Sequence, residues 1–142
     1  MDFEAKIAEL GLLIPKPAKP AGSYKPCVIV DNIAYISGQG PLLEDGSFAK
    51  GKVGADVDLE TAQNHARLCG LAILSALKNE IGSINKVDQL IKLTGFVNCI
   101  ESFTQQPLVI NGCSNMMKDI FGETGVHAVS YTHLRAHETC HN

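Results

Sequence analysis

The sequence predicts a two-layer α/β fold of the α+β kind, with a mixed sheet that carries two long helices on one face. Two stretches with apolar residues at helical spacing, 59–80 and 103–121, are long enough for helices of several turns. Short runs rich in β-branched and aromatic residues, at 27–30, 33–36 and 87–98, are typical of strands. Long helices bury their apolar side against a sheet, which makes two layers around one core.

The composition is that of one ordinary globular domain. The chain has 142 residues, of which 45% are hydrophobic and 19% are charged. A net charge of −3 and an isoelectric point near 5.9 provide no basic surface, so we expect no nucleic-acid partner. No apolar run approaches the ~18 residues of a membrane span, and the first residues lack a signal-peptide pattern. We therefore expect a cytoplasmic protein without membrane contact.

The five cysteines are an odd number and form no Cys-x-x-Cys pair. Four of them lie among apolar neighbours within predicted helices or strands. We expect them to be small buried side chains with free thiols, as in a reducing compartment.

The first 26 residues are predicted to form a short helix and an extended connector. Asp2 is the N-cap of a helix that ends at Leu10, with Gly11 just beyond it. Ile14–Pro26 contains four prolines, which exclude a helix interior and a central strand. We call this segment the proline-rich connector.

Cys27–Val30 and Ile33–Ile36 are predicted to pair as a hairpin, because the Asp-Asn pair at 31–32 is a two-residue turn signal. Ser37-Gly38-Gln39 follows the second strand directly. The chain leaves the core there, and a ligand can approach the backbone because glycine has no Cβ.

The first long helix is predicted from about Leu59 to Glu80, with Asp56 or Asp58 as its N-cap. A polar loop precedes it. In this loop, Gly46–Val53 nearly matches a phosphate-binding loop but ends in valine where Ser or Thr would hold Mg²⁺. We interpret it as a glycine-rich surface loop.

A strand over Val87–Asn98 and a second long helix within Phe103–Phe121 complete the predicted elements. Both faces of the strand contain apolar residues and are expected to be partly buried. Pro107 is tolerated in the first turn of the helix, and Gly122 ends it.

A strand that leads into Ser-Gly-Gln-Gly-Pro, as residues 33–41 do, resembles the core motif of the RidA/YjgF family. These proteins are reactive-intermediate deaminases, formerly described as translation inhibitors or endoribonucleases. The resemblance covers residues 5–128 and implies the chorismate-mutase-like RidA fold, assembled as a homotrimer with ligand clefts between subunits. The implied reaction is the hydrolysis of reactive enamines and imines to 2-oxo acids and ammonia, without metal or organic cofactor.

The resemblance also implies which residues line the cleft. Three positions match the family's catalytic residues: Tyr24, Ser37 and Gly38. Three more are candidates for substrate binding: Gln39 and two helix asparagines, Asn111 and Asn115, of which only one matches the family. Structural roles remain open for them, such as a loop anchor for the tyrosine, a backbone hydrogen bond at a strand end for the serine, and helix packing for Asn111.

The resemblance ends abruptly after Ala128. The family continues with an arginine, a strand and a last strand that carries an acidic residue, whereas this chain has Val129 and a histidine-rich tail. The tail, 129–142, shows no strand-like alternation, and it resembles a translated sequencing adapter. Our hypothesis is that the domain ends at residue 128 and that the tail is not native, with the final strands missing or replaced. His137–His141 matches H-E-x-x-H, but no packed helix is expected to hold it, so we expect no metal site.

These differences predict an impaired deaminase that acts on a small imine or enamine carboxylate. Arginine forms a bidentate pair with a carboxylate, and Val129 cannot replace it. Two alternatives remain. One is a non-catalytic trimeric module that binds small carboxylates, and the other is an endoribonuclease or translation inhibitor, which the acidic charge disfavours.

Overall fold

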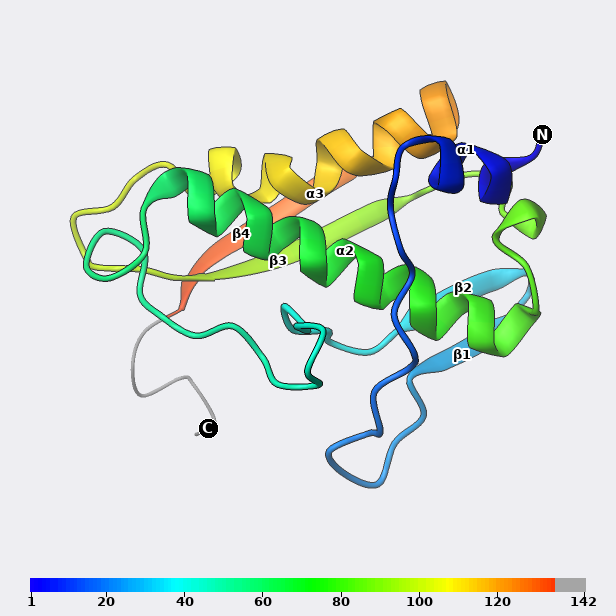
Figure 1. Cartoon of the computed structure of the whole chain (residues 1–142), viewed down its shortest axis with the longest axis horizontal. Helices are drawn as coiled ribbons and strands as arrows, with labels where there is room; N and C mark the ends of the chain where they lie inside the picture. The colour runs from blue at the N-terminus through cyan, green and yellow to red at the C-terminus, as the bar shows by residue number, and fades with distance from the viewer. Residues whose placement is uncertain (135–142) are drawn as a thin grey trace.

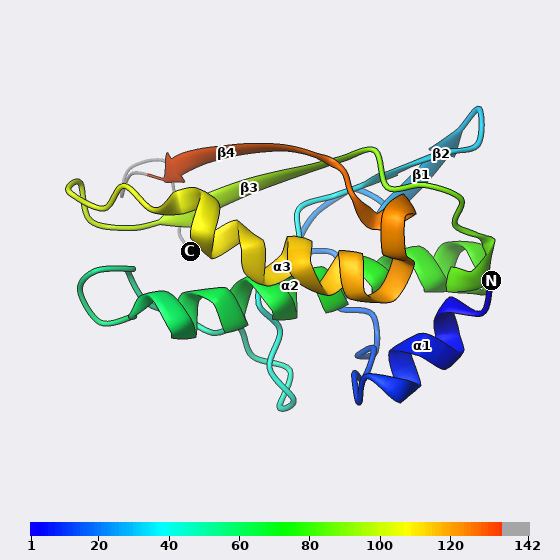
Figure 2. The ribbon, with the colours of Figure 1, turned by 90° about the horizontal axis from the view of Figure 1, so that it is seen from above.

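The computed structural model describes residues 1–134, and Figure 1 shows the arrangement of its helices and strands. In chain order the elements are α1 (Phe3–Glu9), β1 (Cys27–Val30), β2 (Ile33–Ile36), α2 (Leu59–Ile81), the 3-10 turn η1 (Ile84–Lys86), β3 (Lys92–Asn98), α3 (Gln106–Phe121), the 3-10 turn η2 (Gly122–Gly125) and β4 (Ala128–Leu134). The strands lie in one layer and α2 and α3 lie against it, whereas α1 lies on the far side of these helices (Figure 2). The predicted two-layer class is confirmed.

Hydrogen bonds join the strands as two separate pairs within that layer. β1 and β2 are antiparallel, with Cys27 opposite Ile36, and their turn has Asp31 and Asn32 at φ 50° and 63°. These positive values are those of the tight hairpin turn that the Asp-Asn pair predicts. β3 and β4 are parallel from Lys92 opposite Ala128 onward. Among the described residues no ladder links the two pairs, so the predicted mixed sheet consists of one antiparallel and one parallel pair.

The expectation that the tail contains no strand is wrong, because Ala128–Leu134 forms β4. Val129 and Tyr131 do alternate with Ser130 and Thr132, and these residue types favour a strand. Residues 135–142, which include the H-E-x-x-H motif, lie outside the described residues. The non-native origin of the tail stays a prediction.

The predicted strand Val87–Asn98 begins later than expected, at Lys92. Residues 84–86 form η1, Val87 is extended, and residues 87–91 belong to no ladder. The Leu90 N–H donates to the Thr124 carbonyl of the turn η2 at 2.8 Å, and the Ile91 carbonyl accepts a hydrogen bond from the Ala128 N–H at the start of β4 at 3.0 Å.

Side-chain caps determine where the helices begin. Asp2 caps α1, as predicted. Of the two candidate caps for α2, Asp58 accepts a hydrogen bond from the Thr61 N–H at 2.8 Å. Asp56 instead accepts from the Lys52 N–H at 2.6 Å and closes the preceding loop.

α2 and α3 touch at two glycines. A Cβ on Gly112 would lie 2.8 Å from the Cα of Gln63, which is backbone of α2. A Cβ on Gly70 would lie 2.7 Å from the Met116 Cε and 2.8 Å from the Cys113 Sγ. The two helices can approach this closely because neither glycine has a side chain. The main apolar core surrounds this contact and extends to α1.

Candidate functional site

A pocket of about 300 Å³ lies where the proline-rich connector crosses α2 beside the end of β2. The connector passes in front of α2 in Figure 1. The pocket is lined by residues 16–21, Tyr24 and Pro26 of the connector, by Ser37–Gly40, by Leu42 and Phe48 of the following loop, and by Ala72, Ser75 and Ala76 of α2. Its walls therefore come from three segments that are distant in the sequence.

Four of the six predicted site residues meet in this pocket: Tyr24, Ser37, Gly38 and Gln39. The Tyr24 hydroxyl oxygen accepts a hydrogen bond from the Ala21 N–H at 3.1 Å, which leaves its own hydrogen available to a ligand. The Gln39 side-chain amide donates to the Ser37 carbonyl at 3.3 Å. The family resemblance implies that these residues line a cleft, and the fold brings them together in one pocket.

Ser37 also has the structural role that was left open for it. Its hydroxyl donates to the Pro26 carbonyl at 3.3 Å, and its N–H donates to the same oxygen at 2.9 Å. These bonds tie the end of β2 to the end of the connector. The oxygen lone pairs of the hydroxyl remain free to accept a hydrogen bond from a ligand or a water molecule.

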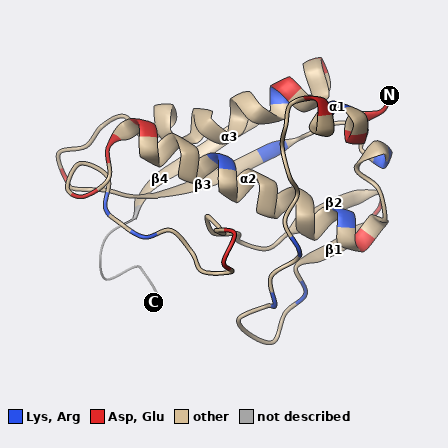
Figure 3. Cartoon of the chain, viewed as in Figure 1, with Lys and Arg blue, Asp and Glu red and all other residues tan. Residues whose placement is uncertain are grey.

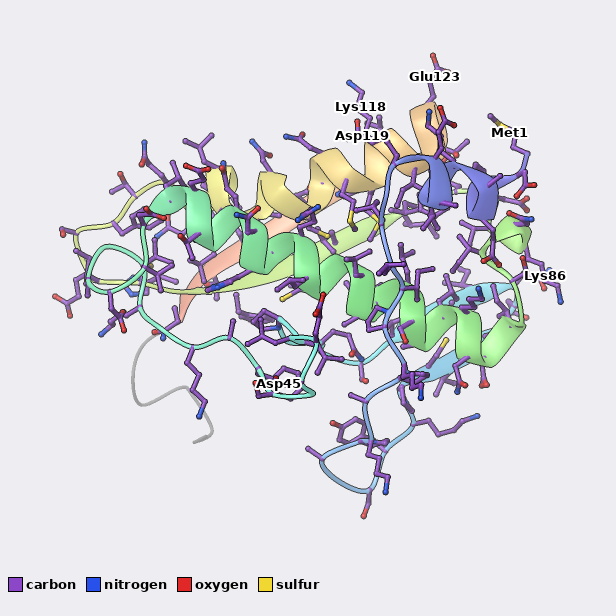
Figure 4. The ribbon with its side chains drawn as sticks, in the orientation of Figure 1. Met1, Asp45, Lys86, Lys118, Asp119 and Glu123 are labelled. Atoms are coloured by element: carbon purple, nitrogen blue, oxygen red, sulfur yellow. The ribbon has the colours of Figure 1, made fainter. Side chains whose placement is uncertain are left out.

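The two asparagines lie elsewhere. Asn111 and Asn115 are exposed on α3 and do not line the pocket of this single chain. The charged side chains of Lys118, Asp119 and Glu123, near the end of the same helix, project outward from the molecule in Figure 4. A substrate-binding role for either asparagine stays a prediction.

Several lining residues were not predicted from the sequence. Lys16 and Lys19 belong to the connector, and Ser75 donates from α2 to the Pro15 carbonyl at 2.6 Å. A signal for the lysines was present, because the connector repeats the dipeptide Lys-Pro three times. No comparable signal marks Ser75, since a serine within a helix is common and only the crossing connector gives it a partner.

The polar groups of the pocket are hydroxyls, amides and ammonium groups. Its lining contains no Asp, Glu, His or Cys side chain. The N–H groups of Gly38, Gln39 and Gly40 have no backbone acceptor within residues 1–134. The pocket can therefore offer several hydrogen-bond donors to a ligand, but it offers no carboxylate or imidazole as a proton acceptor.

The thiols lie in the core rather than in the pocket. Cys27, Cys99 and Cys113 are buried and Cys69 is half-buried, and all four are free, as predicted. Burial raises the pKa of Cys69 to about 11 and that of Cys113 to about 12. The fifth cysteine, Cys140, lies outside the described residues.

Gly46–Val53 is a loop, as predicted; its first residues are exposed at the surface, whereas Val53 at its end is buried and bridges Cys99. Leu42 and Phe48 form an isolated antiparallel bridge there, and the loop leads into further turns rather than directly into a helix. Among residues 1–134 no group of three or more His, Cys, Asp or Glu side chains is placed to hold a metal ion. None of the helices in that range is both long enough and apolar enough to cross a membrane.

The sequence of this chain is similar to those of known proteins. The model of the YjgF/chorismate-mutase-like family, described as "putative endoribonuclease", matches residues 4–134. Protein TCP17 of Trypanosoma cruzi is 35% identical over 125 residues, which are 87% of this chain and 78% of that protein. The family match extends beyond the predicted limit at residue 128 and includes β4.

Solved structures show the same fold. The protein Atu1372 of Agrobacterium tumefaciens, whose function is unknown, is 40% identical with a TM-score of 0.82, over 92% of this chain and 80% of that one. A "putative endoribonuclease" from Shewanella oneidensis is 28% identical with a TM-score of 0.90, over 98% of this chain and 93% of that one.

Proposed function

The chain belongs to the YjgF/chorismate-mutase-like family, and we propose that its pocket binds a small imine or enamine carboxylate and hydrolyses it to a 2-oxo acid and ammonia. The observation that supports this proposal is that Tyr24, Ser37, Gly38 and Gln39 line one pocket of about 300 Å³. A pocket of that size suits a small ligand.

The reaction requires few chemical groups from the protein. Water adds to the electrophilic imine carbon, and the resulting carbinolamine loses ammonia to leave a carbonyl group. The site must hold the carboxylate, position the water and supply a proton to the nitrogen. In our proposal the Tyr24 hydroxyl donates a hydrogen bond to the nitrogen, and the Ser37 oxygen accepts one from the attacking water.

We propose that this chain is a weak catalyst. Val129 stands in β4 opposite Leu93, where the family resemblance implies an arginine. It does not line the pocket of the single chain, but the resemblance implies a cleft between subunits, and in our proposal this position reaches the ligand across that interface. A valine offers no charge to the substrate carboxylate. Less of the substrate is then held in a productive orientation.

The test is ammonia release from freshly generated 2-iminopropionate. We expect this chain to accelerate ammonia release weakly. Ser37→Ala should abolish this acceleration, and Val129→Arg should increase it. Val126→Arg is the matched control, because Val126 is also exposed and lies just before β4. If neither this chain nor Val129→Arg accelerates ammonia release, the deaminase proposal is wrong.

A non-catalytic carboxylate-binding module is the second candidate. The observation that favours it is the lack of any Asp, Glu or His side chain in the pocket lining. Such a pocket can bind an anion without supplying a base. A rise in melting temperature with pyruvate, together with no turnover of 2-iminopropionate, would support this candidate.

An endoribonuclease is the third candidate, and it rests on the names of the family and of the Shewanella protein. The net charge of −3 opposes it, since RNA binding draws most of its affinity from phosphate contacts. RNA cleavage that elutes with the purified protein and weakens with added salt would favour it.

We also propose that the chain assembles as a homotrimer. The outer sides of the strands expose large apolar residues: Val30 is 53% exposed, Tyr35 59% and Phe96 65%. Large apolar side chains that are exposed on the strand layer are typical of an interface between subunits. Light scattering on a sizing column tests the proposal, and a monomer at micromolar concentration would contradict it.

A further inference from the structure

All of the formal charge in the pocket comes from two lysines. Lys16 and Lys19 line the pocket, and every other lining residue is neutral. The segment from Gly11 to Pro26 contains three lysines and no acidic residue. Figure 3 shows these cations as blue segments along the connector beside α2. The charge of the pocket is therefore positive and comes from one chain segment.

The two lysines have no acidic partner within the described residues. The ion pairs of residues 1–134 use other lysines, such as Lys25, which lies 3.1 Å from Glu80. Asp45 lies on the loop that carries Leu42 and Phe48 and is labelled in Figure 4, but its carboxylate accepts two hydrogen bonds from Ser47, at 2.9 and 2.5 Å. A ligand is thus the natural source of a negative charge for the pocket.

The connector holds both lysines beside the pocket. Each is followed by a proline, which fixes one backbone angle and limits how far the segment can move. The carbonyl of Pro15, directly before Lys16, accepts the hydrogen bond from the buried Ser75 hydroxyl. This anchor reduces the entropy that would be lost when the ammonium groups meet an anion.

We propose that Lys16 and Lys19 bind the carboxylate of the ligand and make the pocket select an anionic ligand over a neutral one of the same shape. This inference rests on the proposed function of the same pocket. The ammonium groups supply a positive charge to the carboxylate, but not the bidentate geometry of the arginine that this chain lacks at position 129. The apolar side chains of Leu42 and Phe48 and the two alanines of α2 contact the hydrocarbon part of the ligand.

The test is calorimetric titration of the full chain with pyruvate and with its neutral amide, pyruvamide. Because the lysines are exposed, we expect a moderate preference for pyruvate of about tenfold, which decreases in high salt. Lys16→Gln/Lys19→Gln should bind both compounds about equally. Lys16→Arg/Lys19→Arg should keep the preference, since the charge remains.

Lys25→Gln is the matched control. Lys25 belongs to the same connector and also precedes a proline, but it pairs with Glu80 and does not line the pocket. Loss of the Lys25 charge should leave the preference for pyruvate over pyruvamide unchanged. An equal loss of preference in Lys25→Gln would show that only the overall charge of the connector matters, and the proposal would fail.

Three further results would overturn the inference: no pyruvate binding, an unchanged preference in the double glutamine variant, or tighter binding of inorganic phosphate than of pyruvate. Ammonia release from 2-iminopropionate, measured in parallel, separates this inference from the proposed function. A lysine-dependent preference without turnover keeps the inference and rejects the deaminase. Turnover whose KM is the same in the double glutamine variant keeps the deaminase and rejects the inference.

Discussion

α2 presents small residues on two of its sides, and they have opposite consequences. Toward α3, Gly70 lets the side chains of Met116 and Cys113 pack against the helix backbone. Toward the proline-rich connector, Ala72 and Ala76 border a pocket of about 300 Å³. Small residues of α2 thus give a close contact on the side that faces α3 and an empty pocket on the side that faces the connector.

The neighbouring segment explains this difference. α3 is a regular helix whose side chains project into the gaps of the helix beside it, so small residues draw the two helices together. The connector is extended and contains prolines, so it crosses α2 at an angle set by its own backbone and leaves space beneath it. A small residue therefore makes a close contact only where the partner can follow the helix surface.

The largest expected effect is on the α3 side. Gly112→Ala should lower the free energy of unfolding by about 2–3 kcal/mol, because the new Cβ meets the backbone of Gln63, which cannot rotate away. Gly70→Ala is the matched control in the same contact. Its Cβ meets the ends of the Met116 and Cys113 side chains rather than backbone, and the gain in helix propensity offsets part of the cost, so we expect a loss below about 1 kcal/mol. Urea unfolding measures both.

Equal losses in the two alanine variants would contradict the distinction between backbone and side-chain contact. A larger loss in Gly70→Ala than in Gly112→Ala would reverse it.

The next effect concerns the attachment of the connector. Ser75→Ala removes the hydrogen bond to the Pro15 carbonyl and should lower the free energy of unfolding by about 1 kcal/mol. Amide hydrogen exchange should become faster in the connector and stay unchanged in α3. Faster exchange in α3 as well would show that the two sides of α2 are not independent.

A smaller, pH-dependent effect concerns the attachment of α1 to the end of α2. The Glu4 carboxylate accepts hydrogen bonds from Lys78 at 2.6 Å and from Ser83 at 2.9 Å, and these bonds hold its pKa below the usual 4.5. The native state therefore gains stability above about pH 4.5 and loses it as the pH falls through the lowered pKa. Glu4→Gln should be less stable than the parent at about pH 7, and this difference should shrink as the pH falls below about 4.5 and through the lowered pKa.

Glu9→Gln is the control for this pH effect, because Glu9 makes only an exposed pair with Lys6 at 3.8 Å. Thermal unfolding over the same pH range compares the two variants. A difference in stability between Glu4→Gln and the parent that stays constant at every pH would contradict the assigned pKa shift.

The smallest effect on stability is expected in the pocket. Ala76→Leu should fill part of the space under the connector and change the melting temperature little, because the buried Ala76 borders the pocket and the larger side chain can extend into it. Pyruvate binding should be lost in the same variant. A large drop in melting temperature would mean that this side of α2 is as closely packed as the side that faces α3.

Much of the local structure follows from the sequence alone. Asp2 begins α1 because its side chain accepts a hydrogen bond from an N–H three residues later. The Asp31-Asn32 turn and the helix end at Gly122 follow from residues that tolerate positive φ. The Ser-Gly-Gln motif identified the family and, with the resemblance it carries, four residues of the pocket. These signals act within a few positions of the chain, so they can be read without the fold.

How distant segments of the chain meet depends on the packing of the whole molecule. The pocket walls come from the connector, the end of β2 and the middle of α2, and no local pattern places Ser75 under Pro15. The pairing of β4 with β3 likewise depends on a partner far along the chain, with Lys92 opposite Ala128. Capping and turn geometry are properties of neighbouring residues, whereas a pocket is the space left where separate segments cross, and that space exists only once the whole chain has packed.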